Sequence, residues 1–179
     1  MRPEDILHFW FAEAGPQAWW KKSDDFDALI TRRFGKVHVA AHAGELSHWR
    51  TSGRGRLAEV IVLDQFPRNM YRGDARSFAS DGLALVLAQE AVALNVQEGW
   101  AADWRSFLYM PFMHSESLAI HEQAVKIFDE PGLEGNLKFE YAHKKIIDRF
   151  GRYPHRNDIL GRKSTPEEVE FLQQPGSSF

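Results

Sequence analysis

The chain has 179 residues, of which 44% are hydrophobic and 26% charged, a composition typical of a soluble globular protein with one sizeable core. Its net charge of -3 argues against general nucleic-acid binding, and the absence of cysteine excludes disulfides, thiolate nucleophiles and cysteine-based zinc sites. The sequence contains no signal-peptide pattern and no apolar run of membrane-spanning length, so we expect a cytoplasmic protein with no membrane partner.

Helix-start signals and helical spacing predict helices through the first half of the chain. Pro3 and the two carboxylates after it suit a first helical turn, and Gly15–Pro16 ends that helix. Ser23 is a good N-cap for the next helix. The strongly apolar stretch 56–66 could be a buried strand, but its helical spacing favours a helix that ends before Pro67.

The second half of the chain carries equally clear signals. We expect helices at about 81–95, 104–110, 117–128, 138–150 and 166–172. Pro111 is expected to end or kink the second of these, and Gly151 occupies the left-handed C-cap position after the fourth. Thr165 and Glu168 form a capping box at the start of the last.

The expected fold is therefore all-α, because the sequence shows no alternating apolar and polar runs and no hairpin signal. We expect an antiparallel helical array in one domain over residues 1–174, followed by a tail at 175–179. The helical stripes assign one contiguous core to Leu57, Ile61, Leu108, Phe112, Phe139, Ile146 and Phe150.

Three stretches join polar groups to apolar runs: LDQFPRN at 63–69, FLYMPFMHSE at 107–116 and RFGRYPHRN at 149–157. Burying any one of their charges alone would cost several kcal/mol in a low-dielectric interior, whereas pairing them across helices removes that cost. We therefore expect the three stretches to converge.

The pairing that we expect draws on two carboxylates, three guanidinium groups, including that of Arg68, and one imidazole. Asp64 or Glu116 should lie within ion-pair distance of Arg152 or Arg156, with His114 nearby. A structural ion-pair cluster and a ligand-binding site both remain open as interpretations of this arrangement.

As a site, the cluster would suit a small anionic ligand, because guanidinium forks bind carboxylates and phosphates bidentately. Tyrosine side chains would form its walls. The candidate ligand-binding residues are Asp64, Arg68, Asn69, Tyr109, His114, Glu116, Arg152, Tyr153, His155, Arg156 and Asn157.

Metal binding and the common catalytic motifs are not predicted. His114 and His121 are seven residues apart, whereas zinc-binding helices place their ligands three or four apart. The sequence contains no nucleophile elbow, phosphate-binding loop or dinucleotide fingerprint, so we predict no cofactor.

The three stretches, together with GRKSTPEE at 161–168, resemble the signature blocks of bacterial domain of unknown function family 924. The similarity extends over nearly the whole chain. It implies a tetratricopeptide-like helical-repeat arrangement and no established activity.

Two functions remain open. The first is a protein- or peptide-binding scaffold module, whose partner could be a second copy of the chain in a homodimer. The second is an enzyme or sensor for a small anionic molecule, with His114 or His155 as acid or base. The absence of a catalytic motif favours the first.

Overall fold

The computed structural model describes residues 1–178, and these residues contain helices and turns but no β-strand. The α-helices are α1 (Pro3–His8), α2 (Pro16–Trp19), α3 (Asp24–His42), α4 (Gly53–Asp64), α5 (Phe66–Met70), α6 (Asp81–Ala93), α7 (Ala102–Met113), α8 (Leu118–Phe128), α9 (Glu134–Phe150) and α10 (Pro166–Phe171). Between them lie the π-helix η1 (Phe9–Ala14) and the 3-10 helices η2 (Ser47–Thr51), η3 (Ala75–Ser77) and η4 (Pro154–Arg156). The predicted all-α class is confirmed; the tetratricopeptide-like arrangement stays a prediction.

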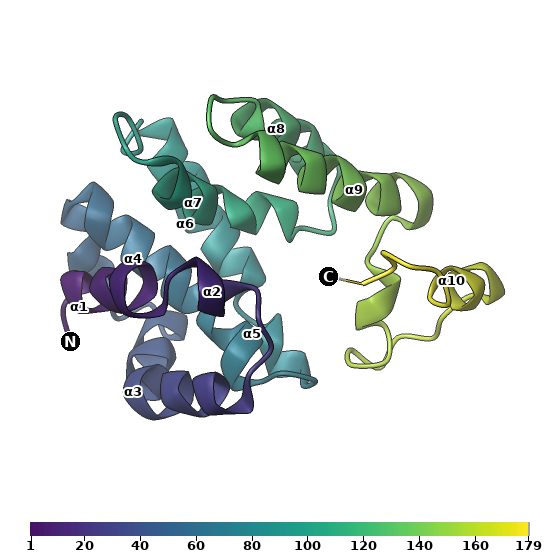
Figure 1. Cartoon of the computed structure of the whole chain (residues 1–179), viewed down its shortest axis with the longest axis horizontal. Helices are drawn as coiled ribbons and strands as arrows, with labels where there is room; N and C mark the ends of the chain where they lie inside the picture. The colour runs from purple at the N-terminus through teal and green to yellow at the C-terminus, as the bar shows by residue number, and fades with distance from the viewer. Residues whose placement is uncertain (179) are drawn as a thin grey trace.

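The centre of the molecule is α4, which packs against α1, α3, α6 and α7 (Figure 1). Every residue from Leu57 to Asp64 is 0% exposed, so this helix has no solvent face beyond its first turn. Burial on all sides explains why the sequence at 56–66 is too apolar to distinguish a strand from a helix. Glu59 is tolerated there because Arg50 binds both of its carboxylate oxygens, at 2.8 and 2.7 Å.

The helix α7 continues through Pro111 to Met113, so the prediction that it ends or kinks near Met110 misplaces its end. Proline removes one backbone donor from a helix. Here the loss falls within the last turn, and the N–H of His114, three residues after the proline, still reaches the Met110 carbonyl at 3.0 Å. The proline therefore sits where the helix is about to stop.

The face that α9 buries differs from the predicted one. Phe139 is 59% exposed, while Glu140, His143 and Ile147 point inward, and the helix starts at Glu134 rather than near 138. Of the predicted stripe, Ile146 is buried but Phe139 is not, because the buried face includes the polar side chains of Glu140 and His143.

The expectation of one contiguous core is also wrong in its C-terminal part. Ile146, Ile147 and Tyr153 form a second, small cluster with Phe150 and Phe171, whereas the other predicted core residues on α4 and α7 belong to the main core. Phe150 is only half-buried. Figure 1 shows α9 beside α8, with the chain then leading to α10 at one end of the molecule.

The domain limits stay a prediction. Within the expected tail, Ser177 is buried and donates its hydroxyl to the Leu172 carbonyl at 3.2 Å, and Phe179 lies outside the described residues. Across residues 1–178, the helices are all too short or too polar to cross a membrane.

Two helical glycines provide a test of the packing around α4. A Cβ on Gly55 would lie 1.9 Å from the Trp49 carbonyl oxygen, whereas a Cβ on Gly35 in α3 would meet nothing within 4 Å. We expect Gly55→Ala to destabilise the protein by several kcal/mol, on the order of an overpacked core. Gly35→Ala should instead stabilise it by roughly 0.5–1 kcal/mol, because alanine restricts the unfolded chain. Urea unfolding of both variants measures this; an unchanged midpoint for Gly55→Ala would contradict the close approach.

Candidate functional site

The candidate site begins with a buried carboxylate at the end of α4. Asp64 is 0% exposed, and its Oδ1 lies 2.8 Å from Nδ1 of His114, the C-cap residue of α7. Its Oδ2 accepts a hydrogen bond from Gln65 at 2.6 Å, and Arg68 lies 3.4 Å from Oδ1. Burial alone would raise the pKa of Asp64, but His114 and Arg68 outweigh it and lower the pKa to about 2.

The imidazole of His114 is held in one orientation by this contact. Burial lowers the pKa of His114, and the positive charge of Arg68 lowers it further against the opposing effect of Asp64. A neutral imidazole that faces an ionised carboxylate donates its Nδ1–H, which leaves Nε2 as an acceptor. Within residues 1–178, Nε2 makes no hydrogen bond. His114 therefore has the arrangement of an oriented general base.

A pair of arginines extends the cluster to α6. Arg68 binds both oxygens of Asp81 at 2.9 Å, and Nη1 of Arg156 lies 3.3 Å from the same carboxylate. Nη2 of Arg156 donates to the His114 carbonyl at 3.1 Å. The three stretches thus converge as predicted, and Asp81, which the sequence did not single out, connects them.

The expected pairing of Asp64 or Glu116 with Arg152 or Arg156 is wrong. Glu116 pairs with Arg162, at 2.6 and 2.9 Å, and Arg152 pairs with Glu168. Arg156 turns to Asp81 instead, because Asp81 begins α6 beside the end of α7. No local pattern marks Arg162 or Asp81 as partners, so sequence reasoning had no signal by which to find them.

The end of α7 is capped by side chains from other parts of the chain. The last carbonyls of a helix have no intrahelical donor. Tyr153 donates its hydroxyl to the Met113 carbonyl at 2.6 Å, and His121 donates Nε2–H to the Ser115 carbonyl at 2.8 Å. Together with Arg156 on the His114 carbonyl, they cap three successive carbonyls. These contacts fix the backbone that carries His114.

His121 belongs to a second buried acid–base pair. Because the Ser115 carbonyl can only accept, Nε2 of His121 carries a hydrogen, and Nδ1 lies 2.6 Å from Oε1 of Glu140. Both side chains are 0% exposed, and burial raises the pKa of Glu140 against the opposing effect of His121. The pair therefore shares one proton and carries little net charge, so its burial costs little free energy.

The remaining predicted residues have mainly structural contacts. Asn157 donates to Ser164 and to Glu168, and it accepts from Arg162 at 2.9 Å. The His155 ring lies 5.6 Å from that of Tyr153, and burial together with Arg156 lowers the pKa of His155 to about 4.

Two predicted residues lie away from the cluster. Asn69 donates to Asp27 at 2.7 Å, and Tyr109 donates to Glu130 at 3.2 Å. Their partners are on α3 and on the loop between α8 and α9. They share a chain segment with Arg68 or His114 but point in other directions.

A pocket of about 320 Å³ opens onto the cluster between the start of α6, the end of α7 and the C-terminal segment. Its polar lining includes Asp81, His114, Glu116 and Arg156. Its apolar lining includes Phe78, Leu85, Pro111 and Leu160. The expected tyrosine walls are absent, since Tyr109 and Tyr153 are 0% exposed and do not line it.

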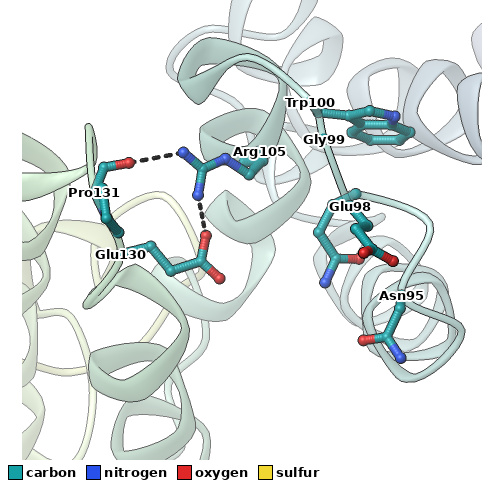
Figure 2. A pocket seen from close by; sticks show the side chains of 8 residues that line it. Asn95, Glu98, Gly99, Trp100, Arg105, Glu130 and Pro131 are labelled. Atoms are coloured by element: carbon teal, nitrogen blue, oxygen red, sulfur yellow. Dashed lines mark hydrogen bonds and ion pairs between the residues drawn. The ribbon is translucent and has the colours of Figure 1, made fainter.

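A larger concavity of about 520 Å³ lies at the loops before α7 and after α8, where Arg105 binds Glu130 and donates to the Pro131 carbonyl at 2.7 Å (Figure 2). Figure 2 shows Trp100 turned away from this ion pair. Arg105 and Glu130 pair with each other, although Nε of Arg105 has no partner within residues 1–178, and no histidine is among the residues that line the space. The smaller pocket is therefore the better candidate. Among residues 1–178, no three His, Asp or Glu side chains are grouped to hold a metal ion.

The buried Asp64 makes stability depend on pH in a defined direction. Its pKa is lower in the folded protein than in the unfolded chain, so its contribution is complete above about pH 4 and is lost as pH falls towards 2. We expect Asp64→Asn to cost roughly 3 kcal/mol at neutral pH. The difference from wild type should shrink by about 2 kcal/mol at pH 2.

Urea unfolding at pH 7 and pH 2 measures both effects. Asp148→Asn, in a surface pair with a carboxylate that is 46% exposed, is the control and should change stability little at either pH. An Asp64→Asn variant whose stability deficit is the same at both pH values would show that Asp64 is not held ionised.

Comparison with known proteins gives a consistent family assignment. The model of the family described as "Bacterial protein of unknown function (DUF924)" matches residues 6–176. A solved structure of a protein of unknown function from Agrobacterium tumefaciens is 40% identical, with 96% of each chain covered and a TM-score of 0.91. A search of curated proteins found no match. The match over nearly the whole chain confirms the resemblance seen in the sequence blocks, and the chain belongs to the DUF924 family.

Proposed function

We propose that the pocket beside His114 binds a small anionic molecule and that His114 accepts a proton or a hydrogen bond from it, as in an enzyme or a ligand sensor. The observation that carries this proposal is the Asp64–His114 contact of 2.8 Å, with Nε2 of His114 unoccupied by any residue from 1 to 178. A buried carboxylate that orients a histidine in a pocket is the arrangement general-base catalysis requires.

The position of the histidine supports the same proposal. His114 is 16% exposed, so solvent and ligands reach it, whereas Asp64 is completely enclosed. Caps on three carbonyls hold the backbone around it. Preorganisation of this kind lowers the cost of adopting a reactive geometry.

The scaffold function that the sequence favoured remains a second proposal. Its support is the apolar surface of α9, where Phe139 and Tyr141 are 59% and 55% exposed. Exposed aromatic side chains are enriched at protein interfaces. The pocket beside His114 has the volume of a small-molecule site rather than of a peptide groove, so the ligand proposal has the stronger geometric support.

A thermal-shift screen of small carboxylates, inorganic phosphate and nucleotides tests the ligand proposal. A ligand at one hundred times its Kd should stabilise the folded protein by about 2.7 kcal/mol. We expect His114→Gln to abolish most of the rise in Tm. His8→Gln, whose side chain in the wild type is 68% exposed, should respond like wild type.

A rise in Tm that persists unchanged in His114→Gln would contradict the role of His114. Failure of all the compounds to raise Tm, together with a stable homodimer or a specific bound peptide, would favour the scaffold function instead.

A further inference from the structure

The first turn of α6 lacks the cap that its sequence could supply. Ser80 is the N-cap residue, but its Oγ lies 2.9 Å from Nδ1 of His42 and makes no bond to the helix. The N–H groups of Gly82 and Leu83 have no acceptor within residues 1–178. A helix start combines such unpaired N–H groups with a partial positive charge, which favours a bound anion.

This helix start opens onto the pocket beside His114, because Gly82 is one of the pocket's lining residues. Most uncapped helix starts simply bind water, so this feature needs independent support. That support comes from Arg156 in η4, a segment distant from α6 in the sequence, which lines the same pocket.

Arg156 is only 6% exposed, and its Nε–H has no acceptor within the described part of the chain. Burying a donor without an acceptor costs free energy. Its two terminal nitrogens are occupied by Asp81 and by the His114 carbonyl, at 3.3 and 3.1 Å. A buried, incompletely bonded guanidinium and an uncapped helix start therefore border one cavity.

The charges around the pocket limit the anion that fits. Asp81 and Glu116 line the pocket, and Arg68 and Arg156 are already paired with carboxylates. The helix start adds only about half a positive charge. The carboxylates of Asp81 and Glu116 would therefore repel a dianion such as phosphate more strongly than the helix start attracts it. A monoanion carries half that charge and meets less repulsion.

The other lining residues limit the body of the ligand. Phe78, Leu85, Pro111 and Leu160 present apolar surface to the pocket. Such surface favours an aliphatic or aromatic group over a strongly hydrated one. The pocket thus combines an anion-binding end with an apolar wall.

We propose that the anion of this site is a monocarboxylate with a small apolar body, bound through the Gly82 N–H and the Arg156 guanidinium. This inference rests on the proposed function of the pocket and names its ligand class. The apolar body lies against Phe78 and Leu160, and Nε2 of His114 remains available to a second polar group of the ligand.

The test exploits a matched pair of substitutions at Gly82. A Cβ there meets nothing within 4 Å, so Gly82→Ala keeps the N–H without a clash. Gly82→Pro removes the N–H, and proline is tolerated in a first helical turn, as Pro67 is at the second position of α5. Circular dichroism melts establish that both variants fold.

Butyrate, its neutral isostere butyramide and inorganic phosphate are the probes, titrated while the amide resonances and the His114 ring are followed by NMR. We expect butyrate to shift the Gly82 amide and the His114 ring in the wild-type protein. Its Kd should be unchanged in Gly82→Ala and at least about tenfold higher in Gly82→Pro, because a hydrogen bond to a charged group is lost. Butyramide and phosphate should bind more weakly than butyrate.

The outcomes separate this inference from the function on which it rests. Equal butyrate affinity in Gly82→Pro and Gly82→Ala, with the His114 ring still shifted, would overturn the carboxylate position and leave the pocket as a ligand site. Phosphate or butyramide binding as tightly as butyrate would overturn the monocarboxylate class. Absence of any shift at both Gly82 and His114 in the wild-type protein, for all three probes, would overturn this inference; a Tm rise that depends on His114 would still support the pocket.

Discussion

The burial of the Asp64 carboxylate is the constraint on which the surrounding structure depends. An ionised group with no exposed surface is stable only if it is paired and fully hydrogen-bonded. Gln65, Arg68 and His114 meet that requirement. They also place the start of α5 and the end of α7 beside the end of the central helix α4.

The side chains that pair with Asp64 need charge partners of their own. Arg68 binds Asp81, which attracts Arg156, and Arg156 caps the carbonyl of His114. The contacts thus return to the histidine from which Asp64 accepts its hydrogen bond, and they tie α6 and the C-terminal segment to α7. Removal of any one member leaves a buried charge without compensation, so we regard these contacts as one cooperative unit.

The same unit leaves certain groups unsatisfied, and they border one pocket. Nε2 of His114, Nε of Arg156 and the N–H groups of Gly82 and Leu83 in α6 have no partner within residues 1–178. The buried charges are thus paired with opposite charges, whereas one acceptor and several donors of hydrogen bonds beside the pocket stay unpaired. The pair formed by Arg105 and Glu130 also leaves Nε of Arg105 without a partner among the described residues, but no histidine lines the space beside it.

The sequence alone determined the local structure, the all-α class and the convergence of three polar stretches, because these depend on short-range signals and on the cost of burying charge. The capping box at Thr165, the C-cap at Gly151 and the apolar character of α4 are such signals. Tertiary structure decided which charges pair and which face α9 buries. Every arginine is equivalent by charge, so only distance in space assigns Arg156 to Asp81 and Arg162 to Glu116. Hydrophobic periodicity likewise missed the inward face of α9, because Glu140 is buried through its contact with His121, a partner on another helix.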